Sequence, residues 1–519
     1  MLSIERILPR ARALYGERPA VSQGDAWLTF EQLGQRVDAL AAGLASLGVK
    51  RGDRVALLDF NSPGYLEGYY AAAQAGFVFV PLNSRLAAPE IKYILNDCGA
   101  KVLIASQPFS SMLESLRGEL PTVEAVLTYG PGPAGTSDYE NLLSQHAGAE
   151  AQIVPAAPDD VAQIYYTSGT TGEPKGVCLT FGNMAVSATD SLIGLGLDWN
   201  DCWLHTAPMF HLVDAWAVWA MPLIGARQVT LHFTPDQFLA AVARWKPTAT
   251  ALPPTLISML SAHPKLAESD LSSLRMIMYG GSPMPLGVLA KAMDVLPKMY
   301  VHAYGITETS GITSILRGED CKPRGTPDET RITGSAGHPV VSTTVEILDD
   351  YGNAVPDGDV GEIAVSGPRV MHGYWNKPKA TSDALRNGRY HSGDLGFIDS
   401  HGNIHVVDRK KDMIISGGEN VYSVEVESVL STHPDVLECA VVGIPSKDWG
   451  EAVHAVVVSR EGQQVAADDL IAYCRGRIAN YKLPKSVSFS TQPLPKTGPG
   501  KIAKRQIRDT FWSGHEKKI

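Results

Sequence analysis

The segment from residue 165 to 176, Tyr-Tyr-Thr-Ser-Gly-Thr-Thr-Gly-Glu-Pro-Lys-Gly, constrains this chain more than any other. Mostly apolar residues precede it at 161–164 and resume at 177–180, so we expect a loop that joins two ordered elements. Its three glycines allow positive φ angles and a close approach of the backbone to a ligand. Its hydroxyls and backbone N–H groups form an anion-binding concavity, and Lys175 adds a positive charge. The segment therefore predicts a loop that binds a polyphosphate.

A Walker A loop is a different pattern, because it needs Gly-Lys-Ser/Thr after four spacer residues. Here Pro174 stands where the second glycine would be, and Gly176 follows the lysine. A flexible surface loop would share the composition, but the full order closed by Pro-Lys-Gly is far more specific. The segment resembles the phosphate loop of the acyl-adenylate-forming enzymes, which are acyl-CoA synthetases, luciferases and adenylation domains. The resemblance implies that these residues hold ATP: Thr167, Ser168, Gly169, Thr170, Thr171, Gly172 and Lys175.

Composition excludes several classes of protein. The net charge of -10 gives no support for nucleic-acid binding, which usually shows a basic face. The six cysteines include no Cys-x-x-Cys pair, so the sequence predicts no zinc or disulfide framework and fits a reducing cytoplasm. The N-terminus lacks the apolar core of a secretory signal. The longest apolar run, near 215–225, is too short for a transmembrane segment.

Helical and extended patterns alternate through the first 300 residues. A helical spacing of apolar residues covers 30–47, a strand pattern follows at 54–58, and a small-residue helix pattern covers 65–75. This alternation predicts an α/β fold with parallel sheets covered by helices, and we expect two such sheets in the large N-terminal domain. The segment 130–158 is rich in Gly, Pro, Ala and Asp, and we expect a surface connection there.

The pattern changes to short strands and turns from about residue 334, which predicts a β-rich subdomain. We expect a large N-terminal domain at 1–407, a charged hinge at 408–411, and a small α+β domain at 412–519. The resemblance implies that the small domain is mobile and that Lys411 is its pivot. It also implies that Gly417 approaches the pantetheine of CoA in a second pose.

The motif Tyr304-Gly-Ile-Thr-Glu308 also resembles the family. The resemblance implies that Tyr304 stacks on adenine, that Thr307 contacts the α-phosphate, and that Glu308 binds Mg²⁺. These three side chains suit ATP and its metal ion, because they supply one π-face, one hydroxyl and one hard oxygen for a hard cation. In isolation, a turn with a capping Thr and Glu explains the motif equally well.

Two further motifs belong to the nucleotide side of the site. Gly281 and Ser282 lie in a Gly-Gly-Ser-Pro turn that resembles the loop against the purine and the acyl pocket, although such turns are common. Asp394 matches the aspartate that takes the ribose hydroxyls, and a carboxylate suits a diol because it is a double acceptor. Its alternative is an ordinary β-turn aspartate. Arg409 matches an arginine on the ribose and phosphate side, and its alternative is a solvated charge cluster.

Lys501 lies in a Pro- and Gly-rich loop near the C-terminus and matches the family's catalytic lysine. A carboxylate that attacks the α-phosphorus of ATP meets a like charge, so a cation between them stabilises the charge in transit. His211 matches a histidine at the carboxylate end of the acyl pocket, although a lone histidine beside apolar residues is more often a core residue. The expected acid pocket comprises Phe210, Leu212, Asp214, Trp216, Gly280, Gly305 and Ile306.

This chain departs from the family pattern at two places. Phe181 stands where a histidine is common, which implies altered packing. Asp214 is unusual for a pocket that holds a plain alkyl chain and leaves the class of acid open. Adenylation domains for α-amino acids usually carry an aspartate where this chain has His211, which favours an acid without an amino group.

The motifs together predict an ATP-dependent acid–CoA ligase that forms AMP and needs ATP, Mg²⁺ and CoA. It would convert a hydrophobic fatty or aromatic acid into an acyl-adenylate and then into a thioester. One alternative is a stand-alone adenylating enzyme that loads a carrier protein, and a luciferase-type oxygenase is less favoured. An alternative of another class is a catalytically silent nucleotide-binding protein. Both a monomer and a homodimer remain open.

Overall fold

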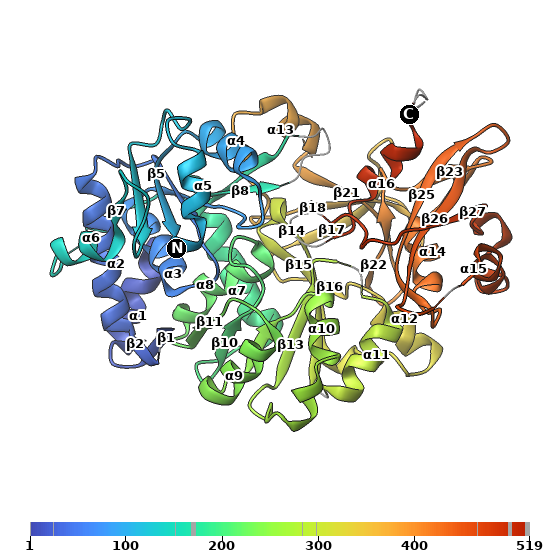
Figure 1. The fold of residues 1–519 in the computed structure, drawn as a ribbon, viewed down its shortest axis with the longest axis horizontal. Coiled ribbons are helices and arrows are strands. Elements are labelled where there is room, and N and C mark those ends of the chain that lie inside the picture. Colours follow the sequence, from blue (N-terminus) through green and yellow to red (C-terminus); the bar gives the residue numbers. More distant parts are fainter. Residues whose placement is uncertain are drawn as a thin grey trace.

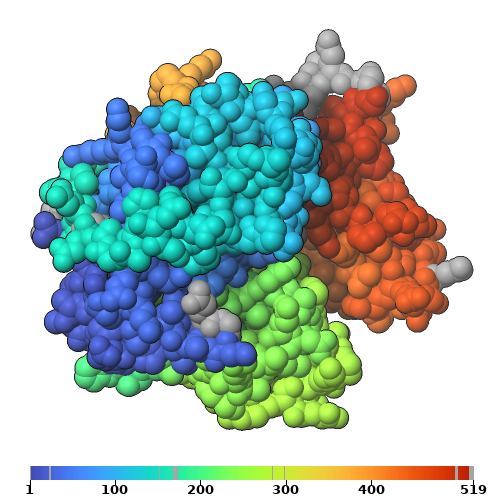
Figure 2. Space-filling model, turned by 60° about the vertical axis from the view of Figure 1, so that its left-hand side comes forward, coloured from blue at the N-terminus to red at the C-terminus, as the bar shows by residue number. Residues whose placement is uncertain are grey.

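The computed structural model describes residues 2–23, 25–150, 152–167, 173–282, 284–296, 298–463, 465–496 and 501–513. Two large sheets with their helices occupy one side of the molecule, and the strands and helices after residue 412 occupy the other (Figure 1). In the space-filling view, the C-terminal residues form one flank against the N-terminal part (Figure 2). This arrangement confirms the predicted α/β class with a small C-terminal domain.

The first large sheet has the strand order β19-β9-β8-β4-β3-β5-β6-β7 within the described residues. Its central strands β4, β3, β5 and β6 are parallel and consist mostly of buried apolar residues, as expected for a sheet covered on both faces. The strands β8 and β9, which precede and follow residues 168–174, pair antiparallel. The strands are β3 (Arg54–Leu58), β4 (Val78–Pro81), β5 (Ala100–Ser106), β6 (Ala125–Tyr129), β7 (Ser137–Asp138), β8 (Val161–Thr167), β9 (Lys175–Thr180) and β19 (Gly373–Tyr374).

The second large sheet has the order β16-β15-β14-β13-β12-β10-β11-β1-β2 in the part of the chain that is described. Strands β10 to β14 are parallel neighbours, and β15 returns antiparallel along β14. The strands are β1 (Pro19–Gln23), β2 (Ala26–Thr29), β10 (Cys202–His205), β11 (Arg227–Thr230), β12 (Ala249–Ala251), β13 (Met276–Gly280), β14 (Met299–Ile306), β15 (Gly311–Leu316) and β16 (His338–Pro339).

Helices cover these sheets and pack between them. The helix α8 is apolar nearly all round and buried, as expected for a helix in the core of a large protein. The helices of this part are α1 (Ile7–Tyr15), α2 (Phe30–Ser46), α3 (Pro63–Ala75), α4 (Ala88–Cys98), α5 (Ser110–Ser115), α6 (Tyr139–Gln145), α7 (Phe181–Leu195), α8 (Leu212–Leu223), α9 (Pro235–Trp245), α10 (Pro254–Ser261), α11 (Leu286–Val295), α12 (Pro327–Thr333) and α13 (Pro378–Ala384). No helix in the described ranges has the length and apolar character needed to span a bilayer.

One expectation was wrong. The segment 130–158 is not only a surface connection, because it contains α6 and the short strand β7. Asp138 caps this helix by accepting a hydrogen bond from the backbone N–H of Asn141. Leu142 and Leu143 bury its apolar side. A helix of two turns leaves too short a periodic pattern to stand out in a segment rich in Gly and Pro.

The predicted β-rich subdomain is an antiparallel sheet near the middle of Figure 1. Its inner face buries a small apolar cluster that includes Ile347, Ile363 and Ile404. Asp394 and Arg409 lie on neighbouring strands of this sheet, opposite one another in register. The strands are β17 (Thr344–Leu348), β18 (Gly361–Ser366), β20 (Leu385–Arg386), β21 (Arg389–Ile398) and β22 (Ile404–Arg409).

The chain after β22 forms a small α+β unit with its own core, which includes Ile414, Val441 and Val453. Its sheet has β26 at the centre, and its last helix, α16, lies just after Lys501. The elements are β23 (Ile414–Ser416), β24 (Glu419–Val421), α14 (Ser423–Leu430), β25 (Val436–Ser446), β26 (Gly450–Ser459), α15 (Ala467–Cys474), β27 (Ser486–Phe489) and α16 (Lys504–Phe511). The exact boundary at 408–411 stays a prediction.

Candidate active site

Three of the predicted nucleotide residues lie together at the end of β14. The hydroxyl of Tyr304 donates a hydrogen bond to Oδ2 of Asp394 at 2.7 Å. Nε of Arg409 lies 2.5 Å from Oδ1 of the same carboxylate. Asp394 is buried, and both of its oxygens have partners. Burial, followed by the nearby Asp394 carboxylate, raises the pKa of Tyr304 well above its ordinary value, so its hydroxyl stays a donor. The three residues form one pre-organised polar cluster.

Glu308 lies in the short turn Thr307–Thr309 that directly follows β14. Its side chain is buried and accepts a hydrogen bond from the hydroxyl of Tyr374 at 2.8 Å. The backbone N–H of Met371 donates to the Glu308 carbonyl oxygen, which fixes the turn. Burial raises the pKa of this carboxyl.

Tyr374 joins Glu308 to the end of the phosphate segment. Nζ of Lys175 lies 5.0 Å from the centre of the Tyr374 ring, a cation–π distance. Sequence reasoning missed Tyr374. It lies on β19, a strand of two residues that pairs with β9 across nearly 200 positions of sequence. No local sequence pattern predicts such a pairing.

The phosphate segment itself is only partly described. Thr167 ends β8 and Lys175 begins β9, and these two residues pair across the strands. The expected strands on both sides are therefore present, but the loop expected at 165–176 was too long, because residues 165–167 belong to β8 and residues 175–176 belong to β9. Ser168, Gly169, Thr170, Thr171 and Gly172 lie outside the described residues.

A magnesium site would need oxygen ligands near the phosphates. The described residues contain no group of three or more His, Cys, Asp or Glu side chains that could hold a metal ion. A single buried carboxylate, Glu308, suits Mg²⁺, which is usually held by one or two carboxylates together with substrate phosphates and waters. The donor set therefore fits a metal that arrives with ATP.

Lys501 faces the same cluster from the C-terminal unit. It lies within electrostatic range of Arg409, Asp394 and Glu308. The residue is exposed to solvent, yet partial loss of hydration, followed by the nearby Arg409 charge, lowers the pKa of Lys501 to about 8. The structure thus places the predicted catalytic lysine and the predicted nucleotide residues at one site.

His211 occupies the N-cap position of α8 without a side-chain capping bond, and its ring packs edge-on against Phe210 at 4.6 Å between centroids. Burial, followed by the nearby charges of Arg85 and Lys501, lowers the pKa of His211 to about 3, so the imidazole is neutral at ordinary pH. Its Nε2 atom is buried and has no hydrogen-bond partner. An unpaired buried nitrogen is costly, so a ligand that bonds to it would be favoured. Sequence reasoning missed Arg85.

Asp214 and Trp216 do not line an acid pocket in this structure, contrary to expectation. Both side chains are fully buried. Asp214 accepts a hydrogen bond from the indole of Trp203 at 2.9 Å and pairs with Nδ1 of His205 at 2.5 Å. Trp216 packs edge-on against Trp203, with 4.8 Å between centroids. These residues hold α8 against β10, so Asp214 gives no information about the acid.

The two glycines predicted for the acid pocket, Gly280 and Gly305, differ from Gly281, which was predicted for the nucleotide side. A Cβ atom on Gly280 would lie 2.1 Å from the carbonyl oxygen of Ala303, and one on Gly305 would lie 2.0 Å from that of Gly311. Close strand packing therefore requires glycine at both positions, whatever the acid. Gly281 is different, because a Cβ atom there would meet only Val213, at 3.9 Å, although its φ of +77° favours glycine.

The remaining predicted residues differ in exposure. The pocket residues Phe210 and Leu212 are buried, whereas the pocket residue Ile306 and the nucleotide-side residue Ser282 keep part of their surface exposed.

The hinge prediction falls at a charged turn. The carbonyl oxygen of Lys411 accepts a hydrogen bond from Nη1 of Arg508 at 2.8 Å. Gly417 is exposed and has a φ of +62°, and a Cβ atom there would lie 2.8 Å from the ring of Trp449. Its approach to pantetheine in a second pose stays a prediction.

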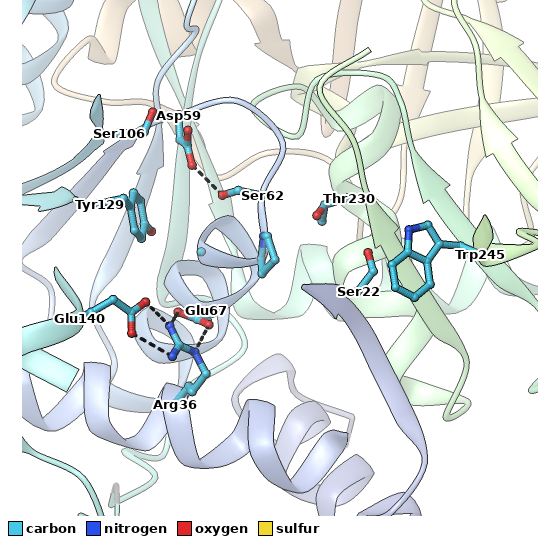
Figure 3. A pocket seen from close by; sticks show the side chains of 12 residues that line it. Ser22, Arg36, Asp59, Ser62, Glu67, Ser106, Tyr129, Glu140, Thr230 and Trp245 are labelled. Carbon is cyan, nitrogen blue, oxygen red and sulfur yellow. Dashed lines mark hydrogen bonds and ion pairs between the residues drawn. The ribbon is translucent and has the colours of Figure 1, made fainter. Parts of the chain in front are cut away.

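A separate polar cavity of about 340 Å³ opens between the two large sheets (Figure 3). Arg36 bridges two carboxylates there, Glu67 at 2.5 Å and Glu140 at 2.6 Å. Asp59 and Ser62 hydrogen-bond to one another on its upper side in this view. None of the predicted site residues lines this cavity, so it is distinct from the candidate active site.

Comparisons with known proteins agree with this geometry. The model of the AMP-binding enzyme family matches residues 8–375, and the model of the AMP-binding enzyme C-terminal domain matches residues 425–501. The chain is 42% identical to a feruloyl-CoA synthase from Amycolatopsis sp over 95% of this chain and 96% of that protein. It is 34% identical to a fatty acid–[acyl-carrier-protein] ligase from Streptomyces coeruleorubidus, over 96% and 95%.

One solved structure of high similarity is an anthranilate CoA ligase in complex with anthranoyl-AMP. It superimposes with a TM-score of 0.89 at 27% sequence identity and covers 98% of this chain and 97% of its own. The similarity therefore extends through both the nucleotide-binding part and the C-terminal unit.

Proposed function

Because this chain belongs to the family of AMP-binding enzymes, we propose that it is an acid–CoA ligase that forms an acyl-adenylate from ATP and releases AMP. One observation carries the proposal. The C-terminal unit presents Lys501 to the cluster of Tyr304, Asp394 and Arg409, beside Glu308. A silent nucleotide-binding protein would have no need for a cation at this place.

In the first half-reaction, a carboxylate oxygen of the acid attacks the α-phosphorus of ATP. The bond to the bridging oxygen of the β-phosphate breaks, and pyrophosphate leaves. Lys501 lies between the two negative groups and stabilises charge as the new bond forms. Glu308 would hold Mg²⁺, which would neutralise negative charge on the phosphates. Asp394 accepts from the ribose, and Tyr304 offers its ring to the adenine.

In the second half-reaction, the sulfur of CoA attacks the carbonyl carbon of the adenylate. The carbon–oxygen bond to AMP breaks, so AMP leaves with one oxygen of the original carboxylate, and the thiol proton passes to solvent. Activation is required because a free carboxylate is a poor electrophile.

We propose an aromatic acid as the substrate, with a fatty acid as the alternative. The relative with 42% identity is a feruloyl-CoA synthase, and the anthranilate CoA ligase also takes an aromatic acid. His211 supports an uncharged, hydrogen-bonding contact to the acid. Because one relative is a fatty acid–[acyl-carrier-protein] ligase, a carrier protein is the second candidate for the acyl acceptor. The free buried cysteines support a reducing compartment such as the cytoplasm, and a monomer or a homodimer fits the proposal.

A screen of carboxylic acids tests the proposal. Pyrophosphate release would be measured for ferulic, benzoic, anthranilic and fatty acids, each with and without CoA. We expect acid-dependent release with aromatic acids, a marked increase with CoA, and loss of turnover when divalent metal is chelated. Release of ADP and orthophosphate, or no turnover with any acid, would overturn the assignment.

A further inference from the structure

The joint between the large and small domains holds a buried carboxylate that the reaction does not use. Asp408 lies on β22, three residues before Lys411, and is buried. Its Oδ2 accepts hydrogen bonds from the backbone N–H of Ser423 at 2.5 Å and from the Ser423 hydroxyl at 2.7 Å. Ser423 begins α14 and is itself fully buried. These hydrogen bonds join the β-rich sheet to the first helix of the small domain.

Ser423 also contacts α16, the helix that follows Lys501. Nζ of Lys504 donates to the Ser423 hydroxyl at 2.7 Å and pairs with Glu427 at 2.8 Å. Lys504 is the first residue of α16 and lies three residues after Lys501. Asp408, Ser423, Lys504 and Glu427 therefore form one polar chain, which we call the hinge latch. Asp408 and Ser423 are buried, and the side chains of Lys504 and Glu427 are partly buried. The latch connects the strand before the hinge to the segment that carries the catalytic lysine.

The latch can form in only a limited range of domain poses. Asp408 precedes the predicted pivot at Lys411, whereas Ser423 and Lys504 follow it. A large change of φ and ψ at the pivot moves everything after it relative to Asp408. The buried Asp408 carboxylate would then lose its partners and have to be hydrated. The contact thus stabilises the pose in which Lys501 faces Arg409 and Asp394.

We propose that Asp408 is a positioning residue that, through Ser423 and Lys504, latches the small domain in the adenylate-forming pose. This inference rests on the proposed function for its two half-reactions. Opening of the latch frees the small domain to move, so that the thiol of CoA can reach the acyl-adenylate. Weakening the latch favours the second pose, so it slows adenylation and spares thioester formation.

Domain pose can be measured without any turnover. The six cysteines are buried, so fluorophores can be attached to cysteines introduced at exposed sites by Glu114→Cys and Asp469→Cys. Energy transfer would be compared in the otherwise unchanged protein, in Asp408→Asn, and in Ser423→Ala. We expect both variants to shift the distribution away from that of the parent protein. The milder Ser423→Ala change keeps the test valid where Asp408→Asn fails to fold.

Kinetics of the two half-reactions provide the second readout. We expect Asp408→Asn to slow acyl-adenylate formation about tenfold, while thioester formation from supplied acyl-adenylate stays within about twofold of the parent rate. Asp350→Asn is the matched control, because it removes an exposed carboxylate that pairs with Lys410 at 2.8 Å beside the same hinge. This control should change neither rate.

The outcomes separate the latch from the function it serves. An unchanged energy-transfer distribution in both variants overturns the latch, whatever the activities are. An equal loss in both half-reactions overturns its role in catalysis, since a merely structural carboxylate would act in that way. If the parent protein activates no acid, the proposed function fails, and the energy-transfer comparison still decides whether Asp408 holds the pose.

Discussion

At the scale of single residues, the charge of Lys501 is the most testable feature. Its pKa of about 8 means that the free enzyme loses this charge as pH rises above 8. Because kcat/KM reports ionisations of the free enzyme, we expect kcat/KM for adenylation to be level below pH 8 and to fall above it. A pH profile of pyrophosphate release at limiting ATP measures this.

The control for that profile is Lys501→Arg, whose guanidinium stays charged throughout. Any activity that it keeps should show no fall between pH 8 and 9.5. The same alkaline fall in Lys501→Arg would assign it to another group. Lys501→Ala should slow adenylation by about a hundredfold or more, the size found when one stabilising donor is lost from a transition state.

His211 gives a second prediction at this scale. Its pKa of about 3 keeps the ring neutral, and its unpaired Nε2 is free to bond to the acid. We expect His211→Ala to raise the KM for the acid about tenfold, the loss of one hydrogen bond of about 1.4 kcal/mol, with little change in the KM for ATP. The matched control is His401→Ala, at an exposed site. Equal effects on both KM values would contradict the placement of His211 at the acid.

The sequence predicted which residue types meet at the nucleotide cluster better than it predicted their surroundings. Tyr304, Asp394, Arg409 and Lys501 lie in motifs with several fixed neighbours, so each could be found by pattern. Asp214 could not be placed, because the local sequence of a carboxylate beside a pocket motif does not differ between one that faces a ligand and one that faces a buried histidine. Only the packing of α8 on β10 decides this.

At the scale of elements, the pairing of β14 with β15 makes Gly305 a structural glycine. A Cβ atom there would come within 2.0 Å of the Gly311 carbonyl oxygen. We expect Gly305→Ala to lower the free energy of unfolding of the large domain by about 1–3 kcal/mol through forced backbone shifts. A larger residue at this position would therefore disturb the sheet rather than simply narrow the range of acids.

Gly287 offers the control for that change. It lies in the first turn of α11, and a Cβ atom there would meet nothing within 4 Å. Gly287→Ala should be neutral or stabilising by about 0.4–1 kcal/mol. Denaturant unfolding of both variants measures the difference. Equal stability of the two variants would mean that β14 and β15 adjust without cost.

The long elements were predictable because each carries its own periodic pattern. The expected helix at 30–47 is α2, and the expected strand at 54–58 is β3. Short elements were not predictable, because α6 and β19 owe their existence to distant partners. β19 pairs with β9, and that pairing brings Tyr374 to Glu308. Such contacts depend on the whole fold and leave no local trace in the sequence.

At the scale of the whole molecule, the two half-reactions should be separable by mutation. Lys501→Ala should block acyl-adenylate formation and leave thioester formation from supplied adenylate largely intact. Lys411→Pro fixes φ near −65°. If it locks the adenylate-forming pose, it should slow thioester formation and leave acyl-adenylate formation largely intact. Single-turnover kinetics of each step measure both variants. Equal slowing of both steps in both variants would remove the case for domain alternation about Lys411.

The most direct test of the acyl-adenylate follows one oxygen atom. The acid would be supplied with both carboxylate oxygens labelled with ¹⁸O, together with ATP, Mg²⁺ and CoA, and the products analysed by mass spectrometry. If the carboxylate attacks the α-phosphorus, the released AMP carries one ¹⁸O atom and the pyrophosphate carries none. Label in orthophosphate, or unlabelled AMP beside a labelled thioester, would contradict an acyl-adenylate route in this protein.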